Sequence, residues 1–168
     1  MGVDFYKYNC YHINTGEDGK LILKGDAIVK RMRDLQIGDV LLMEFDGIGS
    51  EQRGIRPGVV FQNNIGNQSS PNIIALPLSS KVKKRTLPTH VVLGAKDYNL
   101  AVDSVVLCEN PQRMSKQRIL KEITRLDRQA MKKIAIGSLL SSSAIAFLSE
   151  QELLQAHKEA RRLNRIKQ

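Results

Sequence analysis

Short apolar runs, many of them rich in β-branched residues, recur between residues 40 and 108. Each run is bounded by Gly, Pro, Asn, Asp or Ser, which favour turns over a continued strand. Strands this short and closely spaced are typical of a small barrel or a curled antiparallel sheet. The pattern predicts strands at Val40–Phe45, Gly58–Gln62, Ile73–Leu78, His90–Leu93 and Ser104–Cys108. The polar segment 63–71 is rich in turn-forming residues and is predicted to be a loop.

Beyond residue 112 the hydrophobic spacing becomes mainly helical. Ser115 is predicted to cap a short turn, and a last strand is expected at Glu122–Leu126. Asp127 is then predicted to cap a longer helix. One face of that helix carries small and apolar residues at positions 131, 134, 135, 138, 139, 142, 145 and 146.

The two ends of the chain read as extensions. In residues 1–36, turn chemistry at 14–19 suggests a hairpin, and residues 27–35 suggest a helix capped by Asp26. Four of the eight aromatic residues lie at positions 5–11, where packing is favoured over base stacking. At the other end, Ser149 is predicted to cap a basic helix within residues 149–168, for which a solvated role is favoured over nucleic-acid contact.

Charge and composition narrow the class of protein. The 168 residues fit one domain between the two extensions, and a net charge of +9 with a pI near 9.7 favours polyanionic partners. Cys10 and Cys108 lie far apart, and the three histidines are scattered, so a disulfide framework, a metal site and a cofactor are not expected. With neither a signal segment nor a long apolar run, we expect a cytoplasmic protein that does not enter membranes.

The segment 49–58 carries the chain's strongest candidate for chemistry. Its glycines permit tight turns, and Pro57 biases Arg56 toward an extended backbone at the start of an apolar strand. A guanidinium held in this way suits a phosphate or a carboxylate, which it can bind through two parallel hydrogen bonds. A surface arginine in a hairpin is the alternative interpretation.

Several segments in order resemble the MazF/PemK toxin family of toxin–antitoxin systems, in its Gram-positive MazF branch. The similarity spans about residues 37–148 and excludes both extensions, so that three parts are expected: 1–36, 37–148 and 149–168. The segments that carry it are Ile37–Val40, Gly49–Pro57, Gln62–Asn67, Leu87–Val91, Asp103–Glu109, Lys116–Arg118 and Ile123–Asp127.

The resemblance implies a mainly β fold, an SH3-like small barrel of the CcdB/PemK type with C-terminal helices. It also implies a homodimer, a metal-independent endoribonuclease that cuts single-stranded RNA at a short sequence, and an acidic antitoxin that covers the RNA site. Arg56 aligns with the family's catalytic arginine, and Ser79 aligns with its assisting threonine. The remaining implied site residues contact the substrate: Ser50, Glu51, Gln52, Leu87, Pro88 and His90.

The chemistry agrees with this resemblance. Metal-free cleavage uses the neighbouring 2′-OH as nucleophile, and Arg56 would stabilise the charge that develops on the phosphorus oxygens. Ser79 keeps the hydroxyl of the threonine it replaces. A guanidinium is a poor base, so the residue that accepts the 2′-OH proton is open between Glu51 and His90.

One departure from the family pattern concerns base preference. The family's Glu-Gln-Ile-Arg sequence is replaced here by Glu109–Gln112, with Arg113 one place later. Two rival hypotheses therefore stand beside the nuclease: a non-catalytic toxin on the same barrel, such as a CcdB-like gyrase poison, and an RNA- or protein-binding module.

Overall fold

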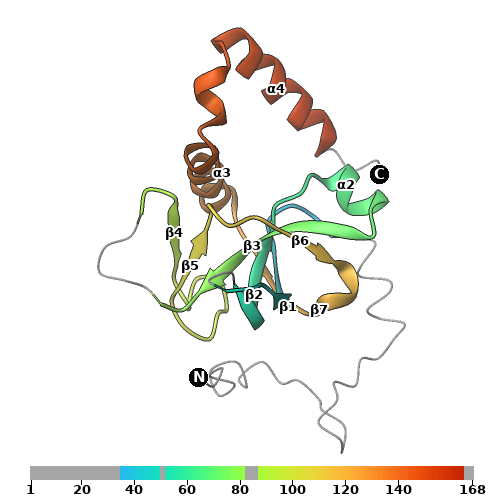
Figure 1. The fold of residues 1–168 in the computed structure, drawn as a ribbon, viewed down its shortest axis with the longest axis vertical. Coiled ribbons are helices and arrows are strands. Elements are labelled where there is room, and N and C mark those ends of the chain that lie inside the picture. The colour runs from blue at the N-terminus through green and yellow to red at the C-terminus, as the bar shows by residue number, and fades with distance from the viewer. Residues whose placement is uncertain (1–34, 50–51, 82–86, 165–168) are drawn as a thin grey trace, which may run out of the picture.

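Seven antiparallel strands form one sheet in the computed structural model, which describes residues 35–49, 52–81 and 87–164 (Figure 1). The order along the sheet is β4-β5-β3-β2-β1-β7, and β6 also pairs with β3. The strands are β1 (Asp39–Asp46), β2 (Arg53–Val60), β3 (Asn72–Ser79), β4 (His90–Leu93), β5 (Ser104–Leu107), β6 (Gln112–Ser115) and β7 (Ile119–Arg125). The helical elements are α2 (Asn64–Ser69), η2 (Lys116–Arg118), α3 (Arg128–Ser142), η3 (Ala144–Phe147) and α4 (Glu150–Leu163).

This architecture confirms the mainly β fold class with C-terminal helices. All five strands predicted between residues 40 and 108 are present, and the last predicted strand is β7. β6 was not foreseen, because Gln112–Ser115 carries one buried apolar residue, Met114, and gives no alternating signal. This segment is a strand because it pairs with the start of β3, and its own sequence shows no strand pattern.

The prediction of a loop at 63–71 was wrong, because this segment contains α2. Asn63 caps that helix, and its side-chain oxygen accepts a hydrogen bond from the Gly66 amide at 2.9 Å. Asn67 is fully buried, and its side-chain nitrogen donates to the carbonyl of Gln62 at 2.9 Å. Asparagines that suggested a turn therefore serve as the cap and the internal anchor of a short helix.

The three C-terminal caps were predicted correctly. The Ser115 side chain accepts from the Gln117 amide, and Asp127 Oδ1 accepts from the Ala130 amide at 2.8 Å. Ser149 forms a reciprocal capping box with Glu152. The longer helix ends sooner than its apolar stripe, since α3 stops at Ser142 and residues 145 and 146 belong to η3. The predicted N-terminal hairpin and helix lie outside the described residues.

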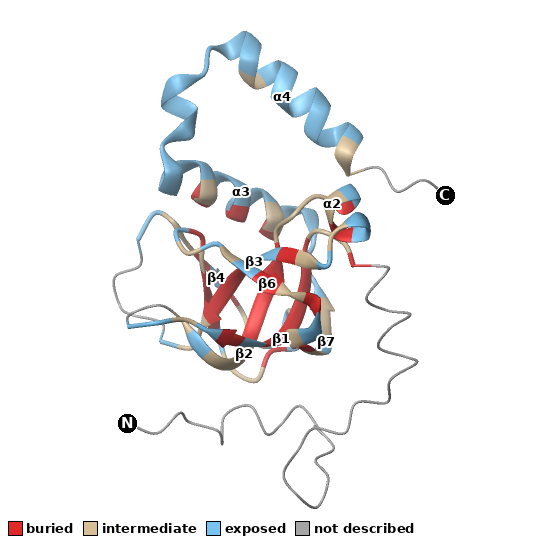
Figure 2. Cartoon of the chain, turned by 45° about the vertical axis from the view of Figure 1, so that its right-hand side comes forward, coloured by how far each residue is buried: buried red, intermediate tan, exposed pale blue. Residues whose placement is uncertain are grey.

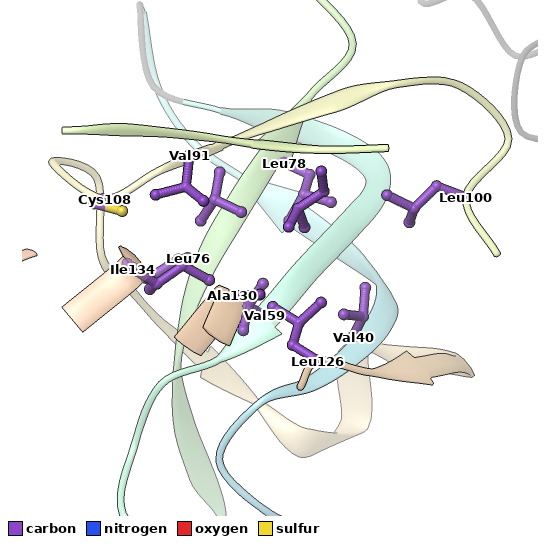
Figure 3. Packing of buried hydrophobic residues seen from close by; sticks show 12 residues of the cluster. Val40, Val59, Leu76, Leu78, Val91, Leu100, Cys108, Leu126, Ala130 and Ile134 are labelled. Carbon is purple, nitrogen blue, oxygen red and sulfur yellow. The ribbon is translucent and has the colours of Figure 1, made fainter. Parts of the chain in front are cut away.

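Two apolar clusters occupy the two faces of the sheet. The buried residues lie along the strands and on the side of α3 that faces them (Figure 2). On one face, α3 lays Ala130 and Ile134 against Val59, Leu76 and other strand residues (Figure 3). On the other face, Leu41, Met43, Phe45 and Val60 pack with residues of β3, β6 and the start of β7. A Cβ at Gly58 would lie 2.5 Å from Met43 Cε and 2.9 Å from Phe45 Cζ, so any side chain there would have to displace the ends of these two residues.

In the part of the chain that the structure describes, no helix has both the length and the apolar character required to cross a bilayer.

Candidate active site

Arg56 lies in the middle of β2, opposite Met43 of β1. Its guanidinium is held by its own strand: Nη1 donates to Gln52 Oε1, and Nη2 donates to the carbonyl oxygen of Arg53 at 2.6 Å. The side chain is half-buried beside the second apolar cluster. These contacts limit the rotamers of a long side chain, so the positive charge has a defined position before any ligand arrives.

Ser79 is the last residue of β3 and is half-buried. The β2–β3 ladder pairs Val60 with Ala75, Val59 with Leu76 and Gly58 with Pro77. The ladder ends at Gly58 and Pro77; continued by two residues, the same register would bring Arg56 opposite Ser79 on one face of the two strands. The Ser79 hydroxyl accepts a hydrogen bond from the Lys81 amide at 3.2 Å, which leaves its own proton available to donate.

His90 begins β4 and is fixed through both ring nitrogens. Nδ1 accepts a hydrogen bond from the Leu87 amide at 3.3 Å, and Nε2 lies 2.9 Å from Glu109 Oε1. Since Nδ1 is the acceptor, the neutral ring carries its proton on Nε2, where it donates to the carboxylate. The exposed fraction of the His90 side chain is only 18%, so the pair forms a fixed edge rather than a mobile one.

The ladders place His90 on the same face of the sheet as Ser79. Ser79 pairs with Val105 of β5, Val105 pairs with Val92 of β4, and His90 is two residues from Val92. Opposite residues, and residues two apart in a strand, point to the same face. That face is turned away from α3, which packs against Leu78, Val106 and Val91 on the other side.

The other predicted site residues divide into three groups. Gln52 is brought to Arg56 and holds it, as described above. Leu87 and Pro88 are exposed just before β4, and Leu87 contacts His90 through both its amide and its carbonyl group. Ser50 and Glu51 lie outside the described residues. Among the described residues, no cluster of three or more His, Cys, Asp or Glu is arranged to hold a metal ion.

Sequence reasoning missed the part that Glu109 plays. The sequence placed it at the end of a matching segment and at the start of one that departs from the family pattern, whereas the structure makes it the partner of His90. The available signal was its place two residues after Leu107, which pairs with His90 across β4 and β5. In the same segment, Gln112 and Arg113 are drawn into β6 opposite Ala75 and Ile74.

The antiparallel sheet with its C-terminal helices is the small barrel expected of toxin-like barrel proteins, and it carries Arg56 on β2 and Ser79 at the end of β3. The chain belongs to the family of PemK-like, MazF-like toxins of type II toxin–antitoxin systems, whose model matches residues 36–137. Endoribonuclease EndoA of Bacillus subtilis is 40% identical over 121 residues, which are 71% of this chain and 99% of that protein.

Solved structures agree on the fold. MazF from Deinococcus radiodurans superposes with a TM-score of 0.55 at 21% identity, covering 63% of this chain and 94% of that one. An endoribonuclease from Mycobacterial species, solved in complex with its cognate antitoxin, gives a TM-score of 0.53 at 21% identity, covering 66% of this chain and 96% of that one. At 21% identity, these two structures support a shared fold and nothing more.

Proposed function

We propose that the protein is a metal-independent endoribonuclease that cleaves single-stranded RNA at a short sequence, with Arg56 and Ser79 as its catalytic residues. Family membership and the 40% identity to Endoribonuclease EndoA support the activity. The observation that supports the residue assignment is the β2–β3 register, because Arg56 and Ser79 each lie two residues beyond its last pair, Gly58 and Pro77.

In this mechanism the 2′-OH of the RNA loses its proton to a general base and attacks the adjacent phosphorus. The bond to the 5′-oxygen breaks, which leaves a 2′,3′-cyclic phosphate on one fragment, and the departing 5′-oxygen takes a proton from water to become a hydroxyl on the other. Negative charge grows on the non-bridging oxygens as the pentacovalent state forms. A phosphate would take the place of the Gln52 and Arg53 oxygens on the Arg56 guanidinium, because charge-assisted hydrogen bonds are stronger than neutral ones. Ser79 would donate its hydroxyl proton to the same phosphate.

His90 is better suited to shape the substrate face than to accept the 2′-OH proton. Its Nδ1 lone pair receives the Leu87 amide, and its Nε2 proton is directed at Glu109. We therefore propose that His90 stands with Leu87 and Pro88 along the RNA-binding face, and that Ser50, Glu51 and Gln52 contribute on the β2 side. Glu51 is then the proposed general base.

The partners follow from the same assignment. We propose that residues 37–148 are the toxin unit, that it acts in the cytoplasm as a homodimer, and that an acidic antitoxin neutralises it. The mycobacterial relative solved with its cognate antitoxin supports the last point. The charge of +9 favours both an RNA substrate and an acidic inhibitor.

The decisive experiment uses purified full-length protein with EDTA present. The 5′ ends of cut fragments from a long, unstructured RNA are mapped to find the recognised sequence. A short RNA with that sequence is then compared with one carrying a single 2′-deoxy sugar at the cut site. We expect cleavage of the first only, with a 2′,3′-cyclic phosphate product. Equal cleavage of both would exclude attack by the 2′-OH.

Variants assign the role of Arg56. Arg56→Ala should lower the cleavage rate by about 100-fold or more, and Arg56→Lys should restore only part of it, because a lysine cannot form two parallel hydrogen bonds. Arg128→Ala removes the same charge from the exposed start of α3, on the other face of the sheet, and should cleave normally. DNA damage in growing cells with intact RNA would instead indicate a gyrase poison.

A further inference from the structure

The second half of α3 lies against the turns next to His90 and Glu109. Gly137 is one of the buried residues of this helix. A Cβ built on it would lie 3.3 Å from the carbonyl oxygen of Thr89 and 3.0 Å from Cys108 Sγ. Thr89 comes directly before His90, and Cys108 comes directly before Glu109. The backbone of α3 therefore reaches the residues behind both members of this side-chain pair.

The two turns are also joined to each other. The Cys108 amide donates to the carbonyl oxygen of Thr89 at 3.3 Å, one residue beyond the β4–β5 pair of His90 and Leu107. This oxygen is the same atom that α3 approaches. Between the side chains, His90 Nε2 lies 2.9 Å from Glu109 Oε1. The start of β4, the end of β5 and the second half of α3 therefore meet at one point.

Ser141 adds a second contact from the same helix. It follows Gly137 by four residues, so the two lie on one side of α3. Ser141 Oγ lies 3.2 Å from the carbonyl oxygen of Cys108 and 2.9 Å from that of Ser138, and its single proton can be donated to either. Since the Cys108 amide is already bonded, both backbone polar groups of this residue are engaged. The point from which the Glu109 side chain extends is thereby fixed.

A glycine at this position needs an explanation, because glycine destabilises the interior of a helix relative to alanine. Its backbone does not supply one, since the φ of Gly137 is not positive, unlike that of Gly38, Gly49 and Gly54. A Cβ would have to push its neighbours by a few tenths of an ångström to fit. What the glycine allows is the close approach of α3 to the two turns.

We propose that Gly137 is a positioning residue for the substrate edge, which consists of Leu87, Pro88 and His90. By letting α3 approach, it fixes the two turns against each other and so keeps the His90 ring in place. α3 lies on the face of the sheet opposite the proposed catalytic pair, so Gly137 itself does not touch the RNA. The inference rests on the proposed function, because it is RNA binding at this edge that gives the position of the ring a consequence.

The edge is sensitive to small displacements. The hydrogen bond from the Leu87 amide to His90 Nδ1 is 3.3 Å long, beyond the usual upper limit of about 3.2 Å. A shift of Thr89 by a few tenths of an ångström moves the residue next to the ring, so this bond would be lost before the shorter contact with Glu109. Leu87 would then be held to His90 through its carbonyl group alone.

The test compares Gly137→Ala with Ala130→Gly in the full-length protein. Both change one methyl group on the buried face of α3, but Ala130 lies near the other end of the helix. Cleavage of a short RNA with the mapped sequence is measured over a range of RNA concentrations. Gly137→Ala should raise KM about fivefold or more and leave kcat within about twofold, because binding is weakened and the chemical step is not. Ala130→Gly should leave both constants within about twofold of the parent.

A compensating variant tests the contact itself. Cys108→Ala removes the sulfur atom that lies nearest to the methyl group added by Gly137→Ala. The double variant should therefore have a KM at least about threefold lower than Gly137→Ala alone. Cys108→Ala alone should leave KM within about twofold of the parent. Recovery of this kind identifies two groups that crowd each other.

Nitrogen NMR of the histidine rings gives a readout that needs no cleavage. The bonds of His90 predict a neutral ring that is protonated on Nε2 in the parent. Gly137→Ala should shift the His90 ring signals, and Ala130→Gly should not. Ser141→Ala removes a contact without adding an atom and should shift them as well, so it decides the question if Gly137→Ala fails to fold.

Two kinds of failure can be told apart. A parent that cuts no RNA would refute the proposed function, while the spectra would still decide the positioning. The positioning role is overturned if Gly137→Ala leaves KM unchanged or lowers kcat instead, or if Ala130→Gly raises KM equally. It is also overturned if loss of the Cys108 sulfur recovers nothing, or if the His90 signals do not move.

Discussion

Arg56 and Ser79 each lie two residues beyond the same pair of the β2–β3 ladder, in which Gly58 stands opposite Pro77. This places the proposed catalytic charge and hydroxyl on rigid strands rather than on the loops that join them. Strand positions hold a constellation more tightly than loop positions, which suits a reaction that depends on the alignment of a phosphate.

Ser79 should be replaceable by threonine but not by alanine. Ser79→Ala removes the proposed hydroxyl donor, and we expect a cleavage rate about 100-fold lower, as for the loss of other donors that stabilise a developing oxyanion. Ser79→Thr keeps the hydroxyl and should stay within about threefold of the parent. Single-turnover cleavage of an RNA containing the mapped site measures both. Equal rates for the alanine and threonine variants would remove Ser79 from the mechanism.

Gln52 should act by holding Arg56. Gln52→Ala removes the oxygen that accepts from Nη1, and we expect a loss of about tenfold in cleavage rate as the guanidinium gains rotamers. Gln52→Glu should cost more, about 100-fold, because a carboxylate at this position competes with the phosphate for the same guanidinium. Rates measured across salt concentrations check the second effect, since salt should recover part of the loss in the glutamate variant only.

Gly58 lies two residues after Arg56 on β2 and next to Met43 and Phe45 of the second apolar cluster. Gly58→Ala should lower the free energy of unfolding by about 1–3 kcal/mol, because the new Cβ meets the ends of Met43 and Phe45. Denaturant unfolding followed by fluorescence or circular dichroism measures the loss. Shortening one neighbour in the same chain, with Met43→Val, should cost less in the Gly58→Ala background than alone. Strictly additive losses would show that the crowding is not between these two residues.

Cys108 should make stability fall in alkaline solution. Burial raises the pKa of its thiol from 9.0 to about 11, opposed weakly by a hydrogen bond with Ser138. Above about pH 9 the unfolded chain loses the thiol proton while the folded chain keeps it. The free energy of unfolding should therefore decline between about pH 9 and 11, by up to about 3 kcal/mol. Cys108→Ala should flatten this part of the pH profile relative to the parent, whatever its effect at neutral pH.

The sequence was sufficient for the barrel strands and the caps because these depend on local patterns. Alternating or β-branched runs indicated β1 to β5, and Asp127 and Ser149 stand directly before helical spacing. α2 and β6 were not predicted because local sequence patterns do not determine them. The asparagines of α2 have equal local preference for turns, and β6 is defined by its pairing with β3.

The site was predicted unevenly for a similar reason. Arg56 was evident from its neighbours Gly54 and Pro57, whereas its pairing with Gln52 and its register with Ser79 are properties of the folded sheet. The bond between His90 and Glu109 joins residues 19 apart and could not be read from spacing alone. The apolar stripe read from the sequence contains Ile134, which is buried against the sheet, but it gave no indication that Ile136 and Leu140 of the same helix are exposed.

The amide of Asn64 serves the first and last described parts of the chain at once. Its oxygen accepts from the Ile37 amide at 2.8 Å, and its nitrogen donates to the Asn164 carbonyl at 3.0 Å. During synthesis, the barrel can close around residue 37 while the last helix is still inside the ribosome. The contact of Asn64 with Asn164 therefore forms after its contact with Ile37, so the order of the two bonds follows the order in which the chain is made.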